Sequence, residues 1–173
     1  MKEFCIVNTL VANLYKEPSF KSELVTQALI KEKLFIIEKK DNWYKVKQWD
    51  NYISWIHKFY TIKFDSNLSI GWNELNINKK SINELITFSK SFIGVPYLWG
   101  GKSSLGFDCS GFVQSVFKIS GINMPRDASK QILKEDLLEI DYCKIQKGDL
   151  LFFSENSHVN HVAIYIGDNK IIH

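Results

Sequence analysis

The spacing of apolar residues changes between residues 62 and 81 of this chain of 173 residues, and that change constrains the fold more than any other feature. Up to about residue 62, apolar and polar residues alternate in short runs such as Trp43–Lys47 and Ile53–His57. A period of two is typical of strands with one buried face. From Ser81, apolar residues recur at helical spacing. We therefore expect an α+β protein with an all-β part first.

Residues 1–62 are expected to form a small all-β barrel. Short strands at regular spacing, separated by turn residues such as Asp41-Asn42 and Asp50-Asn51, favour closure of the sheet. Residues 63–80 are rich in asparagine and have no sustained period, so a linker is expected there. The predicted strands are Phe4–Val11, Leu24–Leu29, Leu34–Glu38, Trp43–Gln48 and Ile53–His57.

Residues 81–173 are expected to form a second domain with two helices and a later strand pair. Ser81 and Glu84 have the form of a capping box that starts the first helix. Gly94 can end this helix, and Pro96 forbids its continuation. A second helix is expected to begin near Ser110. Strands are predicted at Asp149–Phe153, His161–Ile166 and Lys170–His173.

Composition and charge exclude several classes of protein. The apolar share of 45% and the charged share of 24% are ordinary for a globular protein. A net charge of +3 from scattered basic residues does not favour nucleic-acid binding. No apolar run approaches the roughly 18 residues of a membrane span, and Glu3 and Asn8 interrupt the N-terminal apolar stretch. We therefore expect a cytoplasmic protein, or a periplasmic or cell-wall-associated one if the sequence has been trimmed.

The three cysteines, Cys5, Cys109 and Cys143, fit neither a disulfide framework nor a zinc site, and we expect no metal or organic cofactor. Cys109 is distinctive because the second helix begins beside it. The first-turn N–H groups and the helix dipole would stabilise a thiolate there, as a nucleophile requires. The alternative is a buried structural cysteine, since cysteine is among the most buried residue types.

A nucleophilic cysteine needs a general base, and the base needs an orienting partner. His161 and His173 lie on the predicted strand pair, although a packed or surface histidine is the alternative for each. The loop between the strands decides whether they can act together, because side chains alternate between faces. A three-residue loop, Gly167–Asn169, pairs Ala163 with His173 and puts both histidines on one face. A two-residue loop pairs Ile164 with His173 and separates them. We predict the three-residue loop, whose asparagine tolerates the left-handed conformation.

Five ordered blocks of sequence within residues 91–173 resemble the NlpC-type family of papain-like cell-wall cysteine peptidases. The resemblance covers nearly half of the chain, and five blocks in order are far more specific than any one of them. It implies a papain-like domain with helices packed on an antiparallel sheet. The blocks are Phe92–Gly101, Gly106–Val113, Met124–Gln131, Lys147–Phe153 and His161–Gly167.

The resemblance implies a role for each matching residue. Cys109 would be the nucleophile, His161 the general base and acid, and His173 the group that orients His161. The Tyr97 hydroxyl would stabilise the oxyanion together with the Cys109 backbone N–H. The alternative for Tyr97 is a buried aromatic residue with a satisfied hydroxyl.

The block Pro125-Arg126-Asp127, together with an N-terminal SH3-like domain, resembles the γ-D-glutamyl-L-diamino acid endopeptidases. These cut muropeptides between D-glutamate and the diamino acid and favour a free N-terminal L-alanine. By that resemblance Asp108, Ser110 and Asp127 would contact substrate, and a carboxylate suits a free ammonium group. The alternatives are helix capping for Asp108 and Ser110, and a surface pair of Arg126 with Asp127.

Residues 1–62 resemble a bacterial SH3-like domain in Asn13–Ser19, Asn42–Val46 and Ser54–His57. Such domains bind or position cell-wall peptides, and this one would be able to form a wall that excludes longer chains. The NlpC-type family continues past the second histidine with at least another strand, whereas this sequence ends at His173. The departure has two interpretations: a domain cut short at its C-terminus, or a reduced member with low activity.

Taken together, these patterns predict a cysteine endopeptidase that hydrolyses peptidoglycan-derived peptides (muropeptides) without a cofactor. The target bond would join γ-D-glutamate to the diamino acid, and the missing signal sequence fits recycling of imported peptides. One alternative is a catalytically weak or inert protein that binds cell-wall peptides. Another keeps the papain-like fold but has amidase or acyltransferase chemistry.

Overall fold

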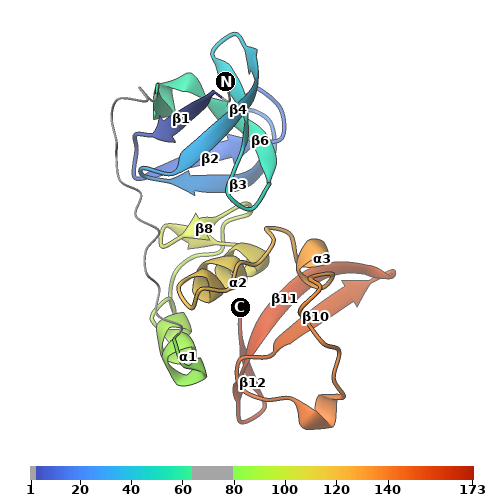
Figure 1. Ribbon diagram of the computed structural model, residues 1–173. Coiled ribbons are helices and arrows are strands. Elements are labelled where there is room, and N and C mark those ends of the chain that lie inside the picture. The colour runs from blue at the N-terminus through green and yellow to red at the C-terminus, as the bar shows by residue number, and fades with distance from the viewer. Residues whose placement is uncertain (1–2, 64–79) are drawn as a thin grey trace.

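The computed structural model of the protein describes residues 3–63 and 80–173, which form an N-terminal and a C-terminal domain (Figure 1). Most of the predicted linker, residues 63–80, lies outside the described residues. Its first residue, Lys63, belongs to the last strand of the N-terminal domain. Within the described ranges, no helix is both long and apolar enough to cross a membrane.

The N-terminal domain is a seven-stranded antiparallel sheet in the order β3-β2-β6-β5-β4-β1-β7. Alternate side chains point inward, so that Leu14, Leu34, Val46 and Ile56 form a dry core. This is the all-β domain that the sequence predicts. The strands are β1 (Phe4–Val7), β2 (Val11–Tyr15), β3 (Leu24–Leu29), β4 (Lys33–Lys40), β5 (Trp43–Lys47), β6 (Ile53–His57) and β7 (Thr61–Lys63).

Two features at the ends of this sheet differ from the prediction. The predicted strand Phe4–Val11 stops at Val7, although the Asn8 N–H still donates to the Tyr60 carbonyl (2.8 Å) beside β7. A separate strand, β2, then starts. The sequence analysis also missed β7, which follows a short 3-10 helix (Lys58–Tyr60) and pairs with β1. Three residues are too few to reveal a period.

The C-terminal domain packs helices on a three-stranded antiparallel sheet in the order β10-β11-β12, as predicted for the fold class. The helix α2 lies between this sheet and the N-terminal domain (Figure 1). Its apolar face, which includes Phe112 and Val116, packs on Val162 and Ile164 of β11. The elements are α1 (Ile82–Lys90), β8 (Lys102–Ser103), β9 (Gly106–Phe107), α2 (Cys109–Lys118), α3 (Ala128–Gln131), β10 (Leu150–Glu155), β11 (His158–Gly167) and β12 (Lys170–Ile172).

The start of α1 is confirmed and its end is corrected. The Ser81 hydroxyl accepts from the Glu84 N–H, and the Glu84 carboxylate accepts from the Ser81 N–H, which completes the predicted capping box. The helix ends at Lys90, before Gly94. The Ser91 hydroxyl donates to the Phe88 carbonyl (2.6 Å) and competes with further helical hydrogen bonds. Ile93, predicted on the buried face, therefore lies beyond the helix and is exposed.

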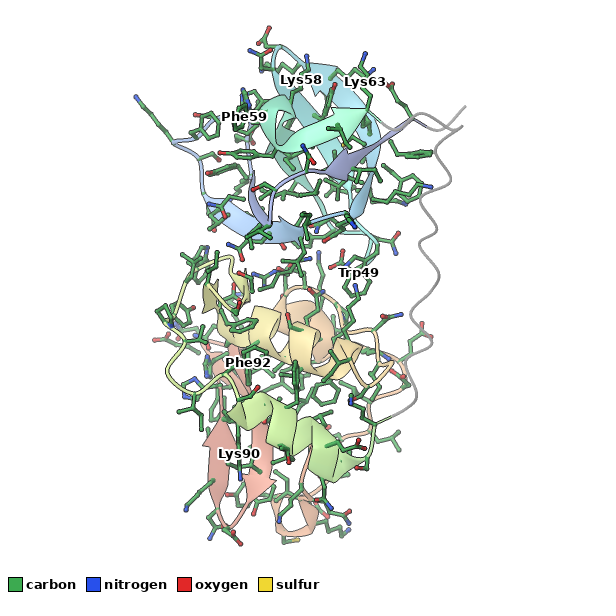
Figure 2. All side chains as sticks on the ribbon, turned by 90° about the vertical axis from the view of Figure 1, so that its left-hand side faces the viewer. Trp49, Lys58, Phe59, Lys63, Lys90 and Phe92 are labelled. Atoms are coloured by element: carbon green, nitrogen blue, oxygen red, sulfur yellow. The ribbon has the colours of Figure 1, made fainter. Side chains whose placement is uncertain are left out.

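Buried hydrogen bonds hold the two domains together. The Gln27 side chain of β3 accepts from the Lys102 N–H (3.1 Å) and from the Ser103 hydroxyl (3.0 Å) of β8. Trp49 extends from the N-terminal domain toward the C-terminal one (Figure 2), and the Lys118 ammonium lies 3.4 Å from its ring centroid. Gln27, Lys102 and Ser103 are buried at this boundary, so replacing one of them would leave a buried polar partner without its hydrogen bond.

We expect Gly111→Ala to destabilise the protein strongly. A Cβ at this position would lie 2.1 Å from the Gly101 carbonyl oxygen, which is backbone and cannot rotate away. Overpacking typically costs about 1–3 kcal/mol in the free energy of unfolding, and we expect a backbone contact this short to exceed that range in urea denaturation. Gly94→Ala is the control, because it places a methyl group in open space at φ +96° and costs only about 1–2 kcal/mol from backbone strain. Equal stability of the two variants would contradict the steric argument.

Candidate functional site

Cys109 is the first residue of α2, and Asp108 caps the helix. The Asp108 carboxylate accepts from the Gly111 N–H (2.7 Å) and from the Gly100 N–H (2.9 Å), so both the helix and the preceding loop are attached to one side chain. Gly111 allows the first turn to approach the Gly101 carbonyl closely. This local geometry fixes the direction in which the Cys109 side chain leaves the helix.

A buried arginine neutralises Asp108. The Arg126 guanidinium donates to both Asp108 carboxylate oxygens (2.6 and 2.9 Å) and to the Ser110 hydroxyl (3.0 Å), and only 2% of its surface is exposed. The suggested surface pair of Arg126 with Asp127 is therefore wrong, because the guanidinium is inside the protein. Asp127 instead forms an exposed pair with Lys130 (3.4 Å). Helix capping, the alternative role for Asp108, is present.

His161 and His173 lie side by side. Their ring centroids are 4.6 Å apart and the rings are nearly perpendicular at 87°. Ile164 pairs with Ile172, which places Ala163 opposite His173. The predicted register and shared face are confirmed. On the other side of His161, the Phe153 ring from β10 lies 5.6 Å away, so the imidazole is held between two rings.

The loop that was predicted to produce this register is wrong in detail. The turn has two residues, Asp168 and Asn169, which both have positive φ (52° and 54°). Such a turn matches the twist of the flanking strands, and aspartate and asparagine tolerate its conformation. The extra residue is Ile166, which forms a bulge in β11 between Tyr165 and Gly167. The bulge shifts the register by one residue, as a third loop residue would.

The sulfur of Cys109 lies against β11. The backbone of Val162, the neighbour of His161, forms a hydrogen bond with it, although His161 itself is not among the groups that shift its pKa in the described part of the chain. Burial and the Asp108 charge raise the pKa of the Cys109 thiol, while hydrogen bonds from the backbone of Val162 and Ser110 and the Arg126 charge lower it less. Burial and the nearby His173 lower the pKa of His161. The Ser110 N–H in the first helical turn lowers the pKa of the thiol, as the sequence predicts, but burial raises it by more.

A cavity of about 330 Å³ is lined by five of the predicted site residues, though by neither His161 nor His173, and by residues of the N-terminal domain. Asp108, Cys109, Ser110 and Asp127 line one side of it, and Tyr97 lies at its edge. The opposite side comes from Glu23, Val25 and Tyr52 of the N-terminal domain. The sequence analysis missed these three residues, because no local pattern places them near Cys109.

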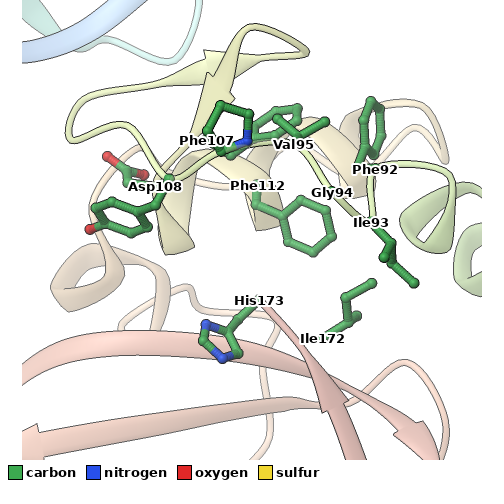
Figure 3. Close-up of a pocket in the computed structure, with 11 residues that line it drawn as sticks. Phe92, Ile93, Gly94, Val95, Phe107, Asp108, Phe112, Ile172 and His173 are labelled. Carbon is green, nitrogen blue, oxygen red and sulfur yellow. The ribbon is translucent and has the colours of Figure 1, made fainter.

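A second cavity of about 320 Å³ lies on the other side of Tyr97 and Asp108. Figure 3 shows Phe107 and Phe112 on one side and His173 on the other. Its walls are mainly apolar. Tyr97, which lines both cavities, is 64% exposed and is therefore not the buried aromatic residue of the alternative interpretation. Among the described residues, no group of three or more histidine, cysteine, aspartate or glutamate side chains is placed to hold a metal ion.

Comparison with known protein families gives two matches. Residues 94–173 match the NlpC/P60 family, and residues 14–58 match the bacterial dipeptidyl-peptidase Sh3 domain. The chain is 33% identical over 177 residues to the gamma-D-glutamyl-L-lysine dipeptidyl-peptidase of Bacillus cereus, covering 98% of this chain and 49% of that protein. The protein of the same name in Bacillus subtilis is 42% identical over 98 residues, covering 55% of this chain and 32% of that protein.

Solved structures give the same match. The crystal structure of an NlpC/P60 family protein from Bacillus cereus has a TM-score of 0.55 and 32% sequence identity, and the alignment covers 99% of this chain and 54% of that one. The chain spans about half the length, or less, of these first curated relatives.

We expect the His161 imidazole to titrate below the ordinary histidine value of about 6.5, as measured by NMR. Burial and the adjacent His173 both disfavour its protonated form. In His173→Asn one of these two causes is removed, so the His161 midpoint should rise. His57→Asn removes a histidine of the N-terminal domain and should leave it unchanged. An unaltered midpoint in His173→Asn would contradict the coupling of the two rings.

Proposed function

Because the C-terminal half of the chain belongs to the NlpC/P60 family and follows a bacterial SH3 domain, we propose that the protein is a cysteine peptidase that hydrolyses peptidoglycan-derived peptides. The observation that carries the proposal is the position of Cys109. Its sulfur lies at the start of α2 and against β11, the strand that carries His161. The ring of His161 lies beside the ring of His173. A thiol at a helix start and two adjacent imidazoles on the sheet against which that helix packs support the roles of nucleophile, base and orienting partner that thiol proteases require.

The pKa directions indicate how the thiol would be activated. A raised Cys109 pKa and a lowered His161 pKa favour the neutral thiol and neutral imidazole in the free protein. His161 would then remove the thiol proton as sulfur attacks the peptide carbonyl, and return that proton to the leaving amine. The resulting thioester at Cys109 would be hydrolysed by water, with His161 again acting as base. His173 would keep the His161 ring in place.

The oxyanion would be stabilised by the Cys109 backbone N–H and the Tyr97 hydroxyl. Backbone N–H groups in the first turn of α2 have no partner within the helix, and they point toward the helix N-terminus. The Tyr97 hydroxyl is protonated at neutral pH because the ordinary tyrosine pKa is about 10, and partial desolvation with the nearby Cys109 and Asp108 raises that pKa further.

The inter-domain cavity supports a substrate with a free N-terminal ammonium group. Arg126 neutralises Asp108, whereas the Asp127 carboxylate forms an exposed pair with Lys130, which contributes little, and a hydrogen bond with the uncharged Tyr52 hydroxyl. Asp127 and Glu23 therefore supply most of the negative charge near the cavity. The wall formed by Glu23 and Tyr52 would exclude longer chains. The negative charge near the cavity and the names of the Bacillus relatives together favour cleavage after an N-terminal L-alanyl-γ-D-glutamyl unit.

We expect Cys109→Ala to abolish hydrolysis of L-alanyl-γ-D-glutamyl-L-lysine while the fold is retained. The nucleophile is lost, and no other thiol lies at the site. Product formation is followed by chromatography. Cys143→Ser removes an exposed cysteine far from α2 and should keep full activity. If Cys109→Ala retained activity, the peptidase proposal would be refuted, and peptide binding without hydrolysis would support the alternative of a binding protein.

We expect Asp127→Asn to lower kcat/KM for the free tripeptide about tenfold or more. The substitution removes a charge-assisted hydrogen bond to the ammonium group, which contributes about 1.5–3 kcal/mol. The N-acetylated tripeptide, a poor substrate already, should be affected little. Asp136→Asn is the matched control, because Asp136 is exposed and pairs only with Lys134. An equal loss for free and acetylated substrates would contradict the assignment of Asp127 to the ammonium group.

A further inference from the structure

One hydrogen bond crosses the domain boundary and reaches the residues that cap α2, the helix that begins with Cys109. The Arg126 Nε donates to the Thr26 Oγ1 at 3.1 Å. Thr26 lies on β3 of the N-terminal domain and is completely buried. It is not one of the residues that line the inter-domain cavity, so it has no position from which to touch a substrate.

The geometry of the guanidinium gives this bond its importance. Arginine presents its N–H groups in a rigid plane, so a partner at Nε fixes the orientation of the whole group. The two terminal nitrogens of Arg126 hold Asp108, and Nη1 also holds Ser110. Thr26 is the partner that approaches from the other domain.

Asp108 links the orientation of the Arg126 guanidinium to the position of α2. Its Oδ1 accepts from the Gly111 N–H and its Oδ2 from the Gly100 N–H, on either side of Cys109. The carboxylate can accept both bonds only in one orientation, and Arg126 sets that orientation. If the guanidinium rotated, its hydrogen bonds to Asp108 would change, the carboxylate would turn with it, and the first turn of α2 would be disturbed.

We propose that Thr26 is a positioning residue for the nucleophile: its hydroxyl fixes the plane of Arg126 and, through Asp108, the first turn of the helix that carries Cys109. The inference rests on the proposed role of Cys109. It gives a role in positioning the nucleophile to the N-terminal domain, which carries none of the reacting groups.

The charges around the sulfur provide a way to observe this effect without a substrate. Burial is the main cause of the raised Cys109 pKa, and the Asp108 charge raises it further while the Arg126 charge lowers it. The other titratable groups around the cavity are Tyr97, Asp127, Tyr52 and Glu23, and His161 and His173 lie beside each other at the sheet that packs on α2. If Arg126 moves away from Asp108, the charge of Asp108 is less neutralised, and the pKa of the Cys109 thiol should rise.

The test measures the rate of iodoacetamide alkylation of Cys109 against pH, in a Cys143→Ser background that leaves Cys5 buried. Thr26→Val keeps the shape and removes the hydroxyl. We expect its alkylation midpoint to move to higher pH and the rate at neutral pH to fall about threefold. Thr26→Ser keeps the hydroxyl and should alkylate as the wild type does.

Ser103→Ala is the matched control. It removes another buried inter-domain hydrogen bond, from Ser103 to Gln27 (3.0 Å), but touches neither Arg126 nor Asp108. A merely structural role of the interface would affect Ser103→Ala and Thr26→Val alike. An unshifted midpoint in Thr26→Val, a shifted one in Thr26→Ser, or an equal shift in Ser103→Ala would each overturn the proposal. Because alkylation needs no hydrolysis, these outcomes are independent of whether Cys109→Ala retains peptidase activity.

Discussion

The buried ion pair between Asp108 and Arg126 is the interaction on which the rest of the site depends. Taking two charges out of water is costly, and the cost is offset only when hydrogen bonds satisfy the remaining polar atoms. Here they do: Asp108 also caps α2 and holds the loop at Gly100, while Arg126 also reaches Ser110 and Thr26. Removing one partner of such a pair typically costs about 3–5 kcal/mol. One pair thus joins the start of α2, the loop that precedes it and both domains.

The site is therefore built at a domain boundary and not within one domain. The C-terminal domain supplies Cys109 and the two imidazoles, and the N-terminal domain closes the cavity with Glu23 and Tyr52. The same boundary is held by Gln27 and Trp49, away from the sulfur. In our proposal, the boundary both limits the length of the substrate and orients the nucleophile. An isolated catalytic domain would lose both contributions.

Much of the fold could be predicted, since its long elements carry a clear period or cap. The capping box at Ser81 and the start of α2 near Cys109 follow from local rules, whereas the shared face of His161 and His173 was predicted from a three-residue loop and arises from a bulge. Short elements could not be predicted in this way. The hairpin of β8 and β9 and the helix α3 have two to four residues each, and their shape depends on packing against other segments.

The sequence by itself determined which residue types are present and in what order: a cysteine at a helix start and two histidines on neighbouring strands. Only the tertiary structure decided how they are surrounded. It placed a bulge at Ile166 where a longer loop was expected, paired Arg126 with Asp108 instead of exposing it, and brought Glu23 and Thr26 to the site from another domain. The reason is physical, because burial and charge pairing depend on contacts between residues far apart in the chain, on which local periodicity carries no information.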